Sequence, residues 1–185
     1  EKKADEPEPL PKENLADLQA ELDSYIGLAD VKEEVKNLIN MVNVYKLRRA
    51  HDLPTTDMSL HMVFTGNPGT GKTMMARMMA RIYRSLDILS KGQLVEVDRS
   101  GLVAGYVGQT ALKTQKVIEK AMGGVLFIDE AYALNGKSEN DFGQEAIDTI
   151  LKAMEDHRDD LVVIVAGYTD LMEKFIHSNP GLESR

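Results

Sequence analysis

The sequence predicts an α/β fold of three layers, in which a parallel sheet lies between helices. Three observations lead to this class. Short apolar runs that are typical of strands alternate with longer stretches of helical periodicity. Two of these runs are almost continuously apolar, which is typical of strands buried on both faces. The β-α-β-α order then requires the crossover connections that join parallel strands.

The composition fits one medium-sized domain. The chain has 185 residues, of which 43% are hydrophobic, and this is enough to bury a proper core. A net charge of −8 argues against nucleic acid bound by a broad basic surface. The absence of cysteine excludes disulfides and thiolate metal sites. No apolar run approaches the ~20 residues of a membrane span, so we expect a cytoplasmic protein with no membrane partner.

The first part of the chain divides into an arm and two helices. Residues 1–13 are charged and rich in proline, and we expect a disordered or linker arm. A short helix is expected within residues 14–24, followed by a break. Apolar residues then recur at helical spacing from Val31 to Tyr45, which predicts a long amphipathic helix. We expect the α/β domain to cover residues 25–185.

The remainder of the chain alternates between strands and helices. Strands are expected at Leu60–Thr65, Leu94–Asp98, Val125–Asp129 and Leu161–Ala166. Helices are expected at about 72–86, 109–122 and 143–157. The first of these helices carries four methionines, which are more typical of a helix buried against the sheet than of a metal site.

The most specific motif is the octet at residues 66–73, which fits the phosphate-binding pattern G-x-x-x-x-G-K-[ST]. A strand enters it and a helix leaves it, as the pattern requires. Its glycines let successive backbone N–H groups turn toward phosphate oxygens at a helix N-terminus. Lys72 would reach the β- and γ-phosphates, and the Thr73 hydroxyl would bind Mg²⁺. We expect the nucleotide to contact Asn67, Pro68, Gly69, Thr70, Gly71, Lys72 and Thr73.

Two carboxylates end the third expected strand. Asp129 and Glu130 follow four apolar residues, at the edge of the sheet where open α/β folds bind ligands. Asp129 is expected to hold Mg²⁺, and Glu130 to orient and polarise the water that attacks the γ-phosphate. The alternative, that the pair only begins a turn or helix, is disfavoured beside a phosphate loop.

A further polar group is expected at the end of the fourth strand. Thr169 is our first choice for contact with the γ-phosphate or the attacking water, with Tyr168 and Asp170 as rivals. The alternative is that Thr169 or Asp170 only caps the next helix.

The chain between the first and third strands has room for an extra β-α unit, and no N-K-x-D guanine-reading motif is present. ATP is therefore favoured over GTP.

Together these residues resemble the AAA+ ATPases, from about Tyr25 to Arg185. Within AAA+, the chain is similar to the family of red-type Rubisco activase (CbbX), stage V sporulation protein K and the secretion ATPase EccA. The likeness is carried by HMVFTGNPGTGKT (61–73), VEVDRSGLVAGYVGQTALKT (95–114), GGVLFIDEAYAL (123–134), DFGQEAIDTILKAMEDHRDDLVVIVAGY (141–168) and NPGLESR (179–185).

The resemblance implies a three-layer P-loop NTPase fold, the large AAA+ subdomain. The last strand and the helical lid would follow Arg185, so we expect a piece of a longer protein that lacks the lid. By the same resemblance, the backbone at Ile26 and Gly27 packs against adenine. Thr169 takes the place of a sensor residue that is asparagine in many AAA+ proteins.

Two further roles follow from the resemblance alone. Tyr106 and Val107 resemble the pore loop that grips a polypeptide in the channel of a ring, the alternative being a tyrosine folded onto its own domain. Arg185 resembles the arginine finger that reaches the γ-phosphate bound by a neighbouring subunit. Arg99 and Arg158 are weaker candidates for the finger.

The expected function is Mg²⁺-dependent hydrolysis of ATP to ADP by a homo-oligomeric ring, a hexamer, that remodels or threads a protein partner. One alternative is a nucleotide-dependent assembly scaffold that hardly hydrolyses ATP. Glu130 and Arg185 argue against it. The other alternative is an AAA+ machine that acts on DNA, and both the acidic balance and the Tyr106 loop argue against that.

Overall fold

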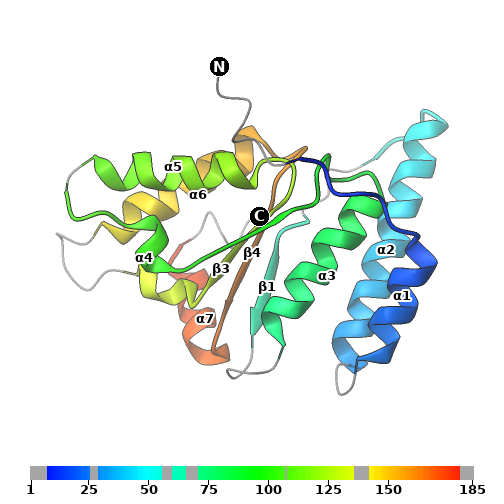
Figure 1. Ribbon diagram of the computed structural model, residues 1–185, viewed down its shortest axis with the longest axis horizontal. Coiled ribbons are helices and arrows are strands. Elements are labelled where there is room, and N and C mark those ends of the chain that lie inside the picture. Colours follow the sequence, from blue (N-terminus) through cyan, green and yellow to red (C-terminus); the bar gives the residue numbers. More distant parts are fainter. Residues whose placement is uncertain are drawn as a thin grey trace.

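A four-stranded parallel sheet forms the middle layer of the computed structural model (Figure 1). The structure describes residues 8–25, 29–55, 60–65, 71–106, 108–135 and 142–179. The strands are β1 (Met62–Thr65), β2 (Leu94–Val97), β3 (Val125–Asp129) and β4 (Val162–Gly167). Helices cover both faces of the sheet, so the predicted α/β class with a central parallel sheet is confirmed.

The order of the strands across the sheet is β1-β4-β3-β2. The strand that separates β1 from β3 is therefore β4, whereas β2, which lies between them in sequence, forms an edge. Thr65 is level with Gly167 in the β1–β4 pair, and Asp129 is level with Ala166 in the β3–β4 pair. The carboxyl ends of β1, β3 and β4 consequently lie side by side.

The helices form two groups, one on each face of the sheet. One group packs with a core made by alternate strand residues such as Phe127 and Ile164, and consists of α1 (Leu15–Ser24), α2 (Ala29–Ala50) and α3 (Lys72–Ser85). The other packs with the intervening residues, such as Leu126 and Val163, and consists of α4 (Arg99–Leu102), α5 (Gln109–Ala121), η2 (Ala131–Leu134), α6 (Gly143–Asp156) and α7 (Thr169–His177). The three helices predicted after Pro54 correspond to α3, α5 and α6 and are confirmed.

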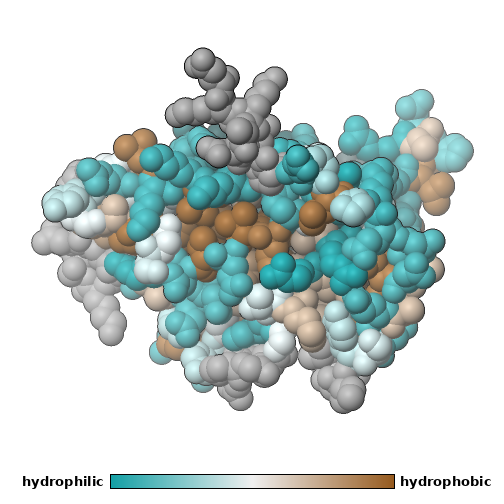
Figure 2. All heavy atoms as spheres, viewed as in Figure 1, coloured by the Kyte–Doolittle hydropathy of each residue, from teal (hydrophilic) through white to brown (hydrophobic). Residues whose placement is uncertain are grey.

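The near-continuous apolar runs of β3 and β4 are explained by this arrangement. Successive side chains of a strand point to opposite faces, and each face of this sheet is covered by helices. Every residue of β3 from Val125 to Ile128 is buried. The visible outer surface in the same view is mostly hydrophilic, with apolar side chains gathered in the centre of the face (Figure 2).

Among the described residues, no helix combines the length and apolar character that a membrane crossing needs.

The methionines of α3 are mainly core residues. Met75, Met78 and Met79 are buried in the same core as Tyr83, whereas Met74 is exposed. The interpretation of α3 as a helix buried against the sheet is therefore confirmed. Burial raises the pKa of Tyr83, whose hydroxyl donates to the carbonyl oxygen of Leu60 at 3.2 Å.

The arm before α1 is attached to α3 over part of its length. We expected residues 1–13 to be disordered or a linker, and the described residues 8–13 have no helix or strand. Polar contacts nevertheless hold residues 10–13 against the domain. The Leu10 N–H donates to the Lys91 carbonyl at 2.8 Å, and Arg84 donates to the Leu10 carbonyl at 2.9 Å. These contacts attach residues 10–13 to the domain, whereas residues 1–7 lie outside the described residues.

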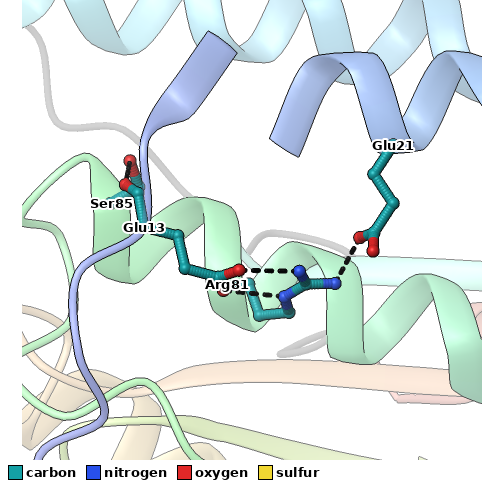
Figure 3. A network of polar contacts seen from close by, with 4 residues as sticks. All are labelled: Glu13, Glu21, Arg81 and Ser85. Carbon is teal, nitrogen blue, oxygen red and sulfur yellow. Dashed lines mark hydrogen bonds and ion pairs between the residues drawn. The ribbon is translucent and has the colours of Figure 1, made fainter. Parts of the chain in front are cut away.

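Arg81 is the centre of the contact between the arm, α1 and α3 (Figure 3). Its guanidinium donates to both carboxylate oxygens of Glu13, at 2.8 and 2.7 Å, and also to Glu21 on α1. Ser85, one turn further along α3, donates to the Glu13 carbonyl at 2.8 Å. The hydrogen bonds from Arg81 hold the pKa of Glu13 below its usual range. We call Glu13, Glu21 and Arg81 the arm latch.

Candidate active site

A cavity of about 420 Å³ lies at the carboxyl edge of the sheet. It is lined by Gly71, Lys72, Thr73, Met74, Asp129, Glu130, Gly167 and Tyr168. These residues come from the start of α3, the end of β3 and the end of β4. Three segments that are distant in sequence meet here because the strand register places the ends of β3 and β4 level with the end of β1. The chain passes from β1 into the phosphate-loop motif.

The start of α3 forms one wall of the cavity. Gly71 is the N-cap, with φ 81°, a left-handed conformation that favours glycine. No side-chain hydrogen bond caps the helix. A helix N-terminus has backbone N–H groups without intrahelical partners and a partial positive charge, which suit an anionic ligand. Lys72 and Thr73 are the first two residues of this helix, so their side chains and the helix end serve the same cavity.

The end of β3 also lines the cavity. Asp129 is half-buried and Glu130 is exposed. The Glu130 N–H donates to the Asp129 Oδ1 at 3.0 Å. Glu130 itself has φ 50° and ψ 47°, a left-handed conformation that non-glycine residues rarely adopt. Strained backbone of this kind clusters at functional sites and costs on the order of 1–3 kcal/mol.

The donor set of the cavity fits a magnesium ion bound together with phosphate. The Thr73 hydroxyl and the Asp129 carboxylate both line it, and oxygen is the ligand atom that Mg²⁺ prefers. Over the described part of the chain, no group of three or more His, Asp or Glu side chains could hold a metal by itself. Mg²⁺ at such sites takes most of its ligands from substrate phosphates and water, so two protein oxygens are sufficient.

The end of β4 brings Tyr168 into the cavity. Tyr168 is 37% exposed, and the Lys72 Nζ lies 5.9 Å from the centre of its ring. Thr169, our first choice at this position, begins α7, and its side chain lies outside the described residues. A helix does begin at Thr169, as the capping alternative expected, but its N-cap is Tyr168 and makes no side-chain cap hydrogen bond.

Tyr132 is a neighbour of the cavity that the sequence analysis missed. Its ring centre lies 6.4 Å from that of Tyr168, with the planes tilted by 46°. Burial raises the pKa of Tyr132, with smaller contributions from the charges of Glu130 and Asp129. The signal available in the sequence was an aromatic residue two positions after Glu130, at the end of a buried strand.

Tyr106 lies on a loop between α4 and α5 and is 72% exposed. It is not folded onto its own domain. The base of the loop is fixed by two buried threonines of α5. The Thr110 Oγ1 accepts from the Ala104 N–H at 3.0 Å, and the Thr114 hydroxyl donates to the Leu102 carbonyl at 3.0 Å. An exposed tyrosine on an anchored loop suits contact with another molecule.

Comparison with known proteins places the chain in a family. Residues 62–182 match the family model described as ATPase family associated with various cellular activities (AAA). The chain belongs to the AAA family. The matched range covers all four strands and every described residue that lines the cavity.

Individual relatives of the AAA chain agree with this assignment. Protein CbxX, chromosomal, of Cupriavidus necator is 51% identical over 180 residues, which are 96% of this chain and 57% of the relative. Stage V sporulation protein K of Bacillus subtilis is 43% identical over 171 residues, 92% of this chain and 53% of the relative. The chloroplastic ribulose bisphosphate carboxylase/oxygenase activase of Cyanidioschyzon merolae is 51% identical over 174 residues, which are 94% of this chain and 58% of the relative. The AAA chain thus spans a little over half the length of these relatives, and the resemblance to AAA+ ATPases of the CbbX and sporulation-protein type is confirmed.

Several residues to which the phosphate-loop motif or the AAA+ resemblance assigns a role lie outside the described residues. These are Ile26, Gly27, Asn67, Pro68, Gly69, Thr70, Val107 and Arg185. Of the two weaker finger candidates, Arg99 donates to the Ala133 carbonyl at 2.8 Å within its own domain. Arg158 lines a separate cavity beside Leu60, which precedes β1 at the other end of the strand.

Proposed function

We propose that this chain is the nucleotide-binding core of a Mg²⁺-dependent ATPase that hydrolyses ATP in the cavity at the strand ends. The observation that carries the proposal is the meeting of Lys72 and Thr73 with Asp129 and Glu130 around one cavity. These are the two halves of a phosphoryl-transfer site, and the fold brings them together from positions far apart in sequence. Membership of the AAA family supports the same activity.

Each of these side chains has a role set by its chemistry. The Lys72 ammonium neutralises charge on the β- and γ-phosphates, and the N-terminus of α3 adds to the positive potential. The oxygens of Thr73 and Asp129 would hold Mg²⁺, which when bound would neutralise charge on the phosphates. Glu130 accepts a hydrogen bond from a water molecule and orients it for in-line attack on the γ-phosphorus. As the bond between the water oxygen and the γ-phosphorus forms, the bond to the bridging oxygen breaks, a proton of the water passes to the Glu130 carboxylate, and ADP and phosphate leave.

We further propose that the whole protein works as a homo-oligomeric, hexameric ring on a protein partner. Tyr106 would contact the partner, because it is exposed on a loop whose base is fixed by Thr110 and Thr114. Arg185 would act on the ATP bound by the neighbouring subunit. A relative whose name makes it an activase of another enzyme supports remodelling of a protein.

The substitution Glu130→Gln tests the hydrolytic role. It removes the base and keeps the size of the side chain, so we expect turnover to fall by roughly 10²–10⁴-fold while ATP still binds. Phosphate release and fluorescent-ATP titration measure the two quantities. Glu33→Gln on α2 is the matched control, because Glu33 is exposed and does not line the cavity, and it should hydrolyse ATP at the wild-type rate.

Two results would change the proposal in different ways. If Glu130→Gln hydrolyses ATP at a normal rate, the assigned mechanism is wrong. If the wild-type protein, tested with the rest of its chain, binds ATP and assembles but does not release phosphate, the assembly scaffold is the better description.

A further inference from the structure

Lys72 and Tyr168 meet across the cavity, although the functional roles described above use only Lys72. The Lys72 Nζ lies 5.9 Å from the centre of the Tyr168 ring. An ammonium group within about 6 Å of a ring centre is attracted by the negative face of the aromatic system. Both residues line the same cavity as Asp129 and Glu130, so this contact is part of the site itself.

The Tyr168 ring is supported from the side by Tyr132. The two ring centres are 6.4 Å apart with a tilt of 46°, a separation at which aromatic pairs attract one another. Tyr132 also packs closely on the backbone of β4. A Cβ added at Gly167 would lie 2.9 Å from the Tyr132 Cδ1 and 2.8 Å from the Met172 Sδ. Tyr168, which directly follows β4, is therefore supported by the Tyr132 ring, and Tyr132 is itself packed on β4.

We propose that Tyr168 is a positioning residue for Lys72, and that its ring face holds the ammonium group in the cavity before the nucleotide arrives. This inference rests on the proposed function, because it assigns the phosphate-binding role to Lys72. A lysine side chain is flexible and loses considerable rotamer freedom when a ligand immobilises it. A ring that already restricts it lowers this cost, and pre-organisation of this kind increases affinity.

The proposal assigns the effect to the ring and not to the hydroxyl of Tyr168. The strength of a contact between a cation and a ring depends on the aromatic system, with tryptophan strongest and phenylalanine comparable to tyrosine. A hydroxyl that contacted the γ-phosphate or the attacking water would instead be lost in phenylalanine. The two roles therefore predict different orders among variants at the same position.

The test compares ATP affinity among Tyr168→Phe, Tyr168→Trp and Tyr168→Leu by titration with a fluorescent ATP analogue and Mg²⁺. We expect Tyr168→Phe and Tyr168→Trp to bind ATP within twofold of the wild type, and Tyr168→Leu to bind it roughly two- to fivefold more weakly. If Tyr168→Phe loses as much ATP affinity as Tyr168→Leu, the hydroxyl is the important group and the proposal is overturned. Thermal unfolding checks each variant, and Tyr168→Met takes the place of Tyr168→Leu as the variant without a ring if Tyr168→Leu does not fold.

A second substitution shows whether the effect passes through Lys72. In a Lys72→Met background, Tyr168→Leu should cause no further loss of ATP affinity, because the cation that the ring holds is gone. A further loss of the same size as in the wild-type background would mean that Tyr168 acts independently, and would overturn the proposal. If wild type and Tyr168→Leu bind ATP equally well, this inference fails while the proposed function stands. If the wild type binds no ATP, both fail.

Discussion

At the scale of single residues, Gly143 lies where the chain leaves no room for a side chain. A Cβ at this position would be 2.0 Å from the Leu134 carbonyl oxygen and 2.9 Å from the Arg99 Nη1. Leu134 ends η2, the short helix that follows Glu130, so the close packing fixes the segment behind the cavity. A backbone oxygen cannot move aside as the end of a flexible side chain can.

We expect Gly143→Ala to destabilise the domain by about 1–3 kcal/mol, the usual cost of overpacking. Gly105→Ala is the matched control, because nothing lies within 4 Å of the added Cβ. Urea unfolding measures both. Equal stabilities of the two variants would contradict the packing described at α6.

The site residues that the sequence predicted share one property. Lys72, Thr73, Asp129 and Glu130 belong to local motifs whose structural context, a strand end or a helix start, can be derived from the chain around them. Tyr132 and Tyr168 differ, because their importance comes from contacts between two strand ends and across the cavity to Lys72. No pattern within one segment reports such a contact. The role of Thr169 at the end of β4 stays a prediction, because its side chain lies outside the described residues.

At the scale of elements, the arm latch joins α3 to the arm and α1, two adjoining segments that lie far from α3 in sequence. Arg81 on α3 binds Glu13 of the arm and Glu21 of α1. The predicted strands and helices after Pro54 were confirmed because hydrophobic periodicity is a local signal. The attachment of the arm could not be predicted in the same way, since it depends on charges 60 and 68 residues apart that only the folded chain brings together.

The arm latch predicts a defined dependence of stability on pH. The hydrogen bonds from Arg81 lower the pKa of Glu13, so the ionised latch stabilises the fold above the ordinary pKa of 4.5. This contribution is lost as the pH falls through the lowered pKa of the folded state. Because Glu13 is 41% exposed, solvent screens the pair, and we expect Glu13→Gln to cost about 0.5–1 kcal/mol at pH 7.

Urea unfolding of wild type and Glu13→Gln at pH 7, 5 and 3 measures this dependence. The difference between the two proteins should be present at pH 7 and 5 and become smaller at pH 3. Glu8→Gln, in an exposed part of the same arm, is the control and should follow the wild type throughout. A difference of the same size at all three pH values would exclude the ionised latch as its cause.

At the scale of the whole molecule, the sheet order explains why a cavity forms at one edge. The last strand in sequence, β4, inserts between β1 and β3, so the start of α3 and the end of β3 are held one strand apart around Tyr168. The sequence predicted the parallel sheet and the shared edge from the β-α alternation. It did not predict the insertion of β4. The order of parallel strands depends on how the crossover connections pass over the sheet, and the sequence of a single strand does not determine this.

Thermal unfolding with and without Mg²⁺ and ATP tests most directly whether this cavity binds ATP through Lys72. A ligand that binds only the folded state stabilises it by about 2.7 kcal/mol at 100 times its Kd, which for a domain of this size raises the Tm by roughly 5–10 °C. We expect this rise in the wild type and a much smaller one in Lys72→Met. No rise in the wild type, or an equal rise in both proteins, would contradict the claim.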